Sequence, residues 1–224
     1  MIFKNREEAG RQLVAHLLQY RNDPRGLILA LPRGGVVVGY QLSLALHLPL
    51  DVFITRKIGA PGNLEYAIGA VAETGSRYLN QEAVSAFGLS QYGLERLVHL
   101  QEKEIARRKD LYRQGRQLPK LTGRTVLLVD DGIATGSTFL ASALAIRSLQ
   151  PHRLVGVIPV GPPSTISEVR AHVDELVVLK TPEPFEAVGN FFMDFTQVGD
   201  RDVVEYLNLA EEAMLERTPS SPAS

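Results

Sequence analysis

Short apolar runs alternate with helical segments along this chain, and this alternation most constrains the fold. Three runs are strand-sized and apolar on both faces, namely 26–31, 125–129 and 154–160. A segment with helical spacing of apolar residues follows each of them, over 36–46, 137–149 and 164–173. Such runs are typical of buried parallel strands joined by right-handed crossovers. The pattern predicts an α/β domain whose ligands bind at the carboxyl ends of the strands.

The rest of the chain predicts further elements around this sheet. Helices are expected over 5–20, 90–113 and 200–216, the second of them long and polar. Strands are expected over 50–58, 67–71, 77–80 and 175–179, with a Gly/Pro-containing loop over 59–65. No repeat or long linker divides the chain. We therefore expect a single domain over 1–217 and a disordered Ser/Pro-rich tail over 218–224.

Composition excludes several functional classes. The chain has no Cys, which rules out disulfides, thiolate metal sites and Cys nucleophiles. The net charge of −1 argues against a broad basic face for nucleic acid. Residues 96–124 nevertheless hold nine Lys/Arg against three Asp/Glu, either as a solvated helix face or as a docking site for phosphate or an acidic partner. With neither a leader-like N-terminus nor a membrane-length apolar stretch, we expect a cytoplasmic protein.

The segment 126–138 carries the strongest chemical signal. An apolar strand ends in Asp130 and Asp131, a glycine-bounded loop follows, and Ser137 and Thr138 open a helix. Loop amides and a helix N-terminus together form an anion site. Adjacent carboxylates would repel a bare phosphate, so the ligand should also present hydroxyls or a metal. A sugar phosphate satisfies both requirements.

Two other phosphate-binding motifs fit this segment poorly. A Walker A loop has four residues between its glycines and then a Lys, whereas three residues separate Gly132 from Gly136 and Ser137 follows. The G-x-G-x-x-G fingerprint of dinucleotide-binding domains is absent. Neither a nucleoside triphosphate loop nor a dinucleotide site is therefore expected here.

The segment resembles the phosphoribosyl pyrophosphate (PRPP) signature of type I phosphoribosyltransferases. More specifically, the chain is similar to bacterial predicted phosphoribosyltransferases of undefined substrate. Three shorter segments support this resemblance by their order: 31–35 (LPRGG), 56–61 (RKIGAP) and 184–189 (PFEAVG). The resemblance implies a Rossmann-like parallel sheet with a small hood, expected over 181–200, and an inserted long helix.

The resemblance also assigns roles around the PRPP signature. Asp130 and Asp131 would hold the ribose hydroxyls, which also carry Mg²⁺, so the metal would be held through PRPP. The loop that follows would cradle the 5-phosphate through its amides and hydroxyls. Its residues are Gly132, Ile133, Ala134, Thr135, Gly136, Ser137 and Thr138.

Two further segments match the family's pyrophosphate-binding elements. Arg33, Gly34 and Gly35 would form the pyrophosphate loop, and in relatives the peptide bond before the equivalent of Arg33 is often cis. Arg56 and Lys57 resemble the cation pair that begins the mobile loop of orotate phosphoribosyltransferase. That loop would be 59–65 here and would close to exclude water.

The acceptor is left open by the sequence. Hypoxanthine-guanine relatives have an Asp where Ala134 stands, which lowers the odds for a 6-oxopurine, although adenine-specific relatives also have Ala. Phe191 and Phe192 in the hood are candidates for stacking on a base, with core packing as the alternative. Glu73 is left open between a hydrogen bond near the site and a plain turn.

The resemblance implies transfer of the 5-phosphoribosyl group of PRPP to a nitrogen base or amine, with release of pyrophosphate. Arg33, Arg56, Lys57, Asp130 and Asp131 are the expected catalytic residues. Relatives are commonly homodimers, and the half-covered helix 90–113 is a candidate contact. Two alternatives stay open: a regulator that binds PRPP or a nucleotide, and a hydrolase or phosphate-binding protein on the same scaffold.

Overall fold

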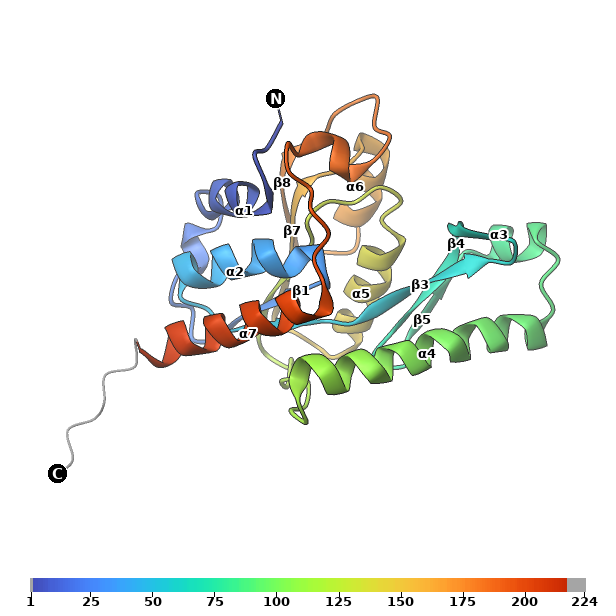
Figure 1. Ribbon diagram of the computed structural model, residues 1–224, viewed down its shortest axis with the longest axis horizontal. Helices are drawn as coiled ribbons and strands as arrows, with labels where there is room; N and C mark the ends of the chain where they lie inside the picture. The colour runs from blue at the N-terminus through green and yellow to red at the C-terminus, as the bar shows by residue number, and fades with distance from the viewer. Residues whose placement is uncertain (1, 217–224) are drawn as a thin grey trace.

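A five-stranded parallel sheet forms the centre of the computed structural model, which describes residues 2–216 (Figure 1). Its strand order is β2-β1-β6-β7-β8. The bounds are β1 Gly26–Ala30, β2 Leu50–Val52, β6 Thr125–Val129, β7 Arg153–Val160 and β8 Glu175–Lys180. The predicted α/β class and parallel sheet are confirmed. The tail predicted over 218–224 lies outside the described residues.

Helices cover both faces of this sheet, as the two-sided apolar strands require. One face packs against α1 (Arg6–Val14) and α2 (Gly34–Leu46), and the other against α5 (Ser137–Ser148) and α6 (Pro163–Arg170). Successive residues of a strand point to opposite faces. Leu27 and Leu29 therefore pack with Phe139 of α5, whereas Ile28 packs with Leu42 of α2. The final helix, α7 (Asp200–Leu215), lies alongside α2 (Figure 1).

An antiparallel arm projects from the sheet (Figure 1). It consists of β3 (Thr55–Ala60), β4 (Asn63–Ala72) and β5 (Arg77–Leu79), followed by α3 (Gln81–Ala86) and α4 (Gln91–Arg113). The long helix α4 runs along the arm and matches the predicted 90–113 closely.

Two sequence predictions in this region were wrong. The single strand expected over 50–58 is divided between the central sheet and the arm, with Phe53 and Ile54 buried at the crossing. The loop expected over 59–65 is a tight hairpin, because β3 runs to Ala60 and β4 begins at Asn63. Only Pro61 and Gly62 turn the chain, and Gly62 supplies a positive φ of 76°.

The N-terminal segment joins the late segment that was predicted as a hood. Residues 181–199 pass over the carboxyl ends of the strands and contain one 3₁₀ turn, η2 (Val188–Phe191). The amide of Phe3 donates to the carbonyl of Phe191 at 2.8 Å, and the amide of Met193 donates to Phe3 at 2.8 Å. The segment that covers the strand ends is therefore built from both ends of the chain, not from late sequence alone.

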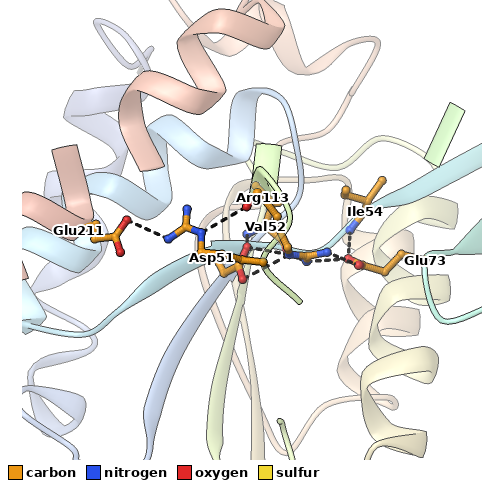
Figure 2. A network of polar contacts seen from close by, with 7 residues as sticks. Asp51, Val52, Ile54, Glu73, Arg113 and Glu211 are labelled. Carbon is orange, nitrogen blue, oxygen red and sulfur yellow. Dashed lines mark hydrogen bonds and ion pairs between the residues drawn. The ribbon is translucent and has the colours of Figure 1, made fainter. Parts of the chain in front are cut away.

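A buried ion-pair network holds the arm to the sheet (Figure 2). Arg113 ends α4 and forms a bidentate ion pair with Glu73, which lies between β4 and β5. Arg113 also donates to the Val52 carbonyl at 2.6 Å and to Asp51 at 3.2 Å. Glu73 in turn accepts from the Ile54 amide at 2.8 Å. Glu73 was left open between a hydrogen bond near the site and a plain turn. In the structure its role is a different one, because its carboxylate binds Arg113 and fixes the end of α4.

Candidate functional site

The loops after β1 and β6 meet at one edge of the sheet because these strands are neighbours. Ala30 pairs with Val129, and the Leu31 amide donates to the Val129 carbonyl at 2.8 Å. The peptide bond between Pro32 and Arg33 is cis, as the family resemblance suggested. The sheet therefore brings Arg33, Gly34 and Gly35 next to Asp130 and Asp131.

Gly34 and Gly35 are required by this close approach. A Cβ at Gly34 would lie 1.9 Å from an Asp131 carboxylate oxygen. A Cβ at Gly35 would lie 2.9 Å from the Val129 carbonyl oxygen and 3.1 Å from the Asp130 Cα. Backbone atoms cannot move aside as a flexible side chain can. The two loops can thus touch only where one of them has no side chain.

Gly35→Ala is expected to destabilise the protein by about 1–3 kcal/mol, because it overpacks the junction between the two loops. The loss should lower the Tm by about 2–4 °C for each kcal/mol. Gly93→Ala is the matched control, since Gly93 is also helical but a Cβ there meets nothing closer than 3.4 Å. The control should be stabilised by up to about 1 kcal/mol. Thermal unfolding of both variants checks this, and a stable Gly35→Ala would contradict the steric account.

Asp130 and Asp131 form a close acidic pair at the end of β6. The Asp131 amide donates to the Asp130 carboxylate at 2.9 Å. Burial, together with the neighbouring Asp131 charge, raises the pKa of Asp130 well above its ordinary value. The folded protein therefore holds a carboxylate that is costly to ionise, which is common at functional sites.

Arg6 completes this pair, and the sequence analysis missed it. Its Nε lies 2.6 Å from an Asp131 oxygen and its Nη1 donates to the Thr196 carbonyl at 2.9 Å. Its guanidinium also lies 3.8 Å from the centre of the Phe195 ring. Arg6 is only 8% exposed although it begins the first helix of the chain. No local pattern distinguishes it from an ordinary helix arginine, because its partners are more than a hundred residues away.

The loop after Asp131 has the form of an anion cradle. Gly136 adopts a positive φ of 69° and α5 then begins at Ser137 without a side-chain cap. First-turn amides have no partner within their own helix, so they are free to bind an anion. Ala134 and Thr135 are exposed, and the Ala134 carbonyl is held by the Thr165 hydroxyl at 2.7 Å. The predicted phosphate loop is therefore anchored to α6 through Thr165, and its residues Ala134 and Thr135 are open to solvent.

Asp200 at the start of α7 ties Arg33 to the long helix. An Arg33 nitrogen lies 3.7 Å from an Asp200 oxygen, which also accepts from the Tyr112 hydroxyl at 2.6 Å. The second Asp200 oxygen accepts from Arg107 at 2.8 Å. Burial opposes ionisation of Asp200, but the hydrogen bonds from Tyr112 and Arg107 outweigh it and lower the pKa of Asp200. Asp200 of α7, itself held by two residues of α4, thus pairs with Arg33 in the loop after β1. The sequence analysis did not predict this contact.

Arg56 and Lys57 lie on β3, at the base of the arm. The half-buried Arg56 donates to Gln101 of α4 at 3.2 Å. Its pKa is lowered by burial and then by the positive charges of Arg108 and Arg33, so it belongs to the same electropositive region as Arg33. Lys57 is the next residue on the strand, so its side chain leaves the opposite face of the arm. Arg56 and Lys57, which were predicted to act as a cation pair, therefore lie on opposite faces of β3.

The two hood aromatics that were candidates for stacking on a base, Phe191 and Phe192, lie in different surroundings. Phe192 is 6% exposed and packs between Phe3 and Phe195. Its ring is thus part of the core, which agrees with the core-packing alternative for Phe192 and not with stacking on a base. Phe191 is half-buried and stacks on Phe185. Phe195, 36% exposed, is the aromatic residue that reaches the site.

A cavity of about 360 Å³ lies between the loop after β1, Asp131 and residues 195–198. It is lined by Arg6, Arg33, Gly34, Asp131, Phe195, Gln197 and Val198. One wall of the cavity is thus cationic and one is acidic. The third belongs to residues 181–199, which we call the covering segment. Among the side chains that the structure describes, those of residues 2–63 and 66–216, no three or more of His, Cys, Asp or Glu gather as a metal site would require.

The family model for the phosphoribosyl transferase domain matches residues 2–192. This range contains the strand ends, the acidic pair and the cradle. The chain belongs to the phosphoribosyl transferase domain family. Its predicted membership, inferred from the PRPP signature, is confirmed.

Individual relatives agree with this phosphoribosyl transferase assignment. Two Mycobacterium tuberculosis proteins, each named "Putative phosphoribosyl transferase" (strains CDC 1551 and H37Rv), are 38% identical over 96% of this chain. The chain spans about half (48%) of the length of these curated relatives. The crystal structure of TT1426 from Thermus thermophilus is 38% identical, with a TM-score of 0.76, over 92% of this chain and 98% of that one.

No helix in the described part of the chain, residues 2–216, is long and apolar enough to cross a membrane.

Proposed function

We propose that the chain transfers the 5-phosphoribosyl group of PRPP to a nitrogen base or amine and releases pyrophosphate. The observation that carries the proposal is the meeting of an acidic pair, an anion cradle and a cationic glycine loop at one edge of the sheet. PRPP has matching parts: a 5-phosphate at one end, ribose hydroxyls in the middle and a pyrophosphate at the other end. Family membership supports the same reaction.

In this proposal Asp130 and Asp131 accept hydrogen bonds from the ribose hydroxyls. The loop from Ala134 to Thr138 holds the 5-phosphate through amides and hydroxyls. Arg33 and Arg56 stabilise the negative charge that develops on the pyrophosphate as its bond to C1 breaks. The nitrogen acceptor then bonds to C1 from the opposite face, and its displaced proton goes to solvent or a nearby base. The chain's contribution is positioning, charge stabilisation and exclusion of water.

Mg²⁺ fits the donor set of this site when it arrives with PRPP. Magnesium is usually bound by one or two carboxylates together with substrate oxygens and waters. Asp130 and Asp131 are the two adjacent carboxylates here. When bound, the metal would neutralise charge on the pyrophosphate.

The acceptor would lie beneath the covering segment, against Phe195. We keep the hood over 181–200 as part of a single domain over 1–217 in this proposal.

The resemblance to type I phosphoribosyltransferases also supports a cytoplasmic homodimer with a role in nucleotide metabolism. Sedimentation of the purified chain tests the dimer.

The test of the proposed function is release of pyrophosphate from PRPP and Mg²⁺ in the presence of single acceptors. Nucleobases and small amines are added one at a time, and a coupled assay detects pyrophosphate. We expect at least one acceptor to give release that depends on both PRPP and enzyme. Asp130→Asn is the inactive control. Binding of PRPP without release for any acceptor would favour a regulator, and failure to bind PRPP would contradict the proposal.

A further inference from the structure

Arg6 makes polar contacts with two parts of the site, the acidic pair after β6 and the segment over residues 181–199. Its guanidinium pairs with Asp131 at 2.6 Å on one side and with the Thr196 carbonyl at 2.9 Å on the other. Phe195, next to Thr196, packs over the same guanidinium. A single side chain from α1 thus links the carboxylate at the end of β6 to the covering segment.

We propose that Arg6 is a positioning residue that aims the Asp131 carboxylate at the ribose and couples ribose binding to the covering segment. The inference rests on the proposed function. The side chains of Arg6 and Asp131 are only 10% and 15% exposed, so their ion pair is shielded from solvent. A planar guanidinium fork can hold a carboxylate and a carbonyl at once, whereas the ammonium group of Lys acts as a point charge. Binding energy from the ribose can therefore reach the segment through one rigid group.

The position of Arg6 in the cavities supports this coupling. It lines the 360 Å³ cavity at the strand ends and also a neighbouring cavity of about 320 Å³ between α1, α2 and α7. Gln197 and Val198 of the covering segment line both cavities as well. A shift of the covering segment would thus change both spaces, and Arg6 is the charged group at their shared wall.

Gly34 shows how tightly Arg6 is placed. A Cβ at Gly34 would lie 2.8 Å from the Arg6 Nε and 1.9 Å from an Asp131 oxygen. The Arg6–Asp131 pair therefore lies directly against the glycine loop. Arg6 supplies the cation that holds the Asp131 carboxylate in this position.

Calorimetric titration of the full chain with three probes tests the inference: PRPP with Mg²⁺, ribose 5-phosphate, and pyrophosphate with Mg²⁺. Arg6→Ala should weaken PRPP and ribose 5-phosphate by about tenfold to a hundredfold, the range for a lost charge-assisted hydrogen bond. Pyrophosphate affinity should stay unchanged, because pyrophosphate has no ribose hydroxyls. A merely structural role would weaken all three probes equally. Arg6→Lys should recover part of the loss, because it restores the charge but not the fork.

Arg11→Ala is the matched control, since Arg11 is an exposed arginine on the same helix. It should bind all three probes like the wild type. Arg6→Gln replaces Arg6→Ala if the latter fails to fold. The coupling has its own readout: the chain has no Trp, so Phe195→Trp provides a single Trp, on the covering segment, that can be excited selectively. PRPP should change its emission when Arg6 is present and much less when Arg6 is Ala.

Three results separate the inference from the proposed function. If the wild type fails to bind PRPP, the proposed function falls and this inference falls with it. If the wild type binds PRPP and Arg6→Ala binds it equally well, the inference alone is overturned. Equal losses for ribose-containing probes and pyrophosphate would also overturn it.

Discussion

Arg113→Met is expected to lower the free energy of unfolding by about 3–5 kcal/mol, because removal of one partner leaves buried charges uncompensated. Only 2% of the Arg113 and Glu73 side chains is exposed, and Asp51 is 17% exposed. Burial, and the nearby Glu73 charge, already raise the pKa of Asp51 against the opposing effect of Arg113. Without the arginine, two carboxylates would face each other in the core, and the link between α4 and the sheet would be lost.

Arg116→Ala provides the control for this prediction. Arg116 follows three residues later and pairs with Glu211 at 2.8 Å, but both side chains are about half exposed. An exposed pair of this kind contributes about 0–1 kcal/mol. Chemical denaturation of both variants should therefore separate them by several kcal/mol. Equal stabilities would show that the buried network does not hold the arm.

Replacing Asp130 and Asp131 together by Asn is the second change with a large expected effect. Saturating PRPP and Mg²⁺ should stabilise the wild type by about 2.7 kcal/mol at a hundred times the Kd. The double variant should show no such stabilisation, because an amide accepts the ribose hydroxyls poorly and carries no charge. Thermal shift with and without PRPP measures the difference.

In the unliganded double variant the two substitutions should act in opposite directions: Asp131→Asn leaves Arg6 without its carboxylate partner and lowers stability, whereas Asp130→Asn raises it. The pKa of Asp130 is raised in the folded state, so its ionisation opposes folding as the pH rises above the ordinary Asp value. An amide removes this cost at neutral pH. Asp174→Asn is the control, because Asp174 lies just before β8, at the end of the sheet away from the site. This variant should keep the thermal shift that PRPP produces. A retained PRPP shift in the double variant would contradict the assignment of the ribose contacts.

The sheet and the PRPP segment could be predicted because their signals are local. Val126 to Val129 are apolar on both sides, and the acids, glycines and hydroxyls follow within nine residues. The order of strands and helices then places the loops after β1 and β6 at one edge. Arg33 and its glycines also follow a strand, and their role was inferred from their resemblance to the family's pyrophosphate loop.

The remaining features depend on contacts between distant segments. Arg6 has the local surroundings of any helix arginine, and only the fold brings it to Asp131. Glu73 lies in a turn-like sequence, yet its buried partner is Arg113, forty residues away. Clustered glycine and proline around Pro61 indicated a turn but not the long hairpin that pairs across it. The burial of Phe192 depends on Phe3, at the other end of the chain.

A crystal structure of the chain with PRPP and Mg²⁺ tests the central claim most directly. The account predicts the 5-phosphate on the amides from Ala134 to Thr138 and the ribose hydroxyls on Asp130 and Asp131. The pyrophosphate should lie against Arg33 and its glycine loop. PRPP bound away from the carboxyl ends of β1 and β6, or bound in the reverse direction across them, would contradict the account.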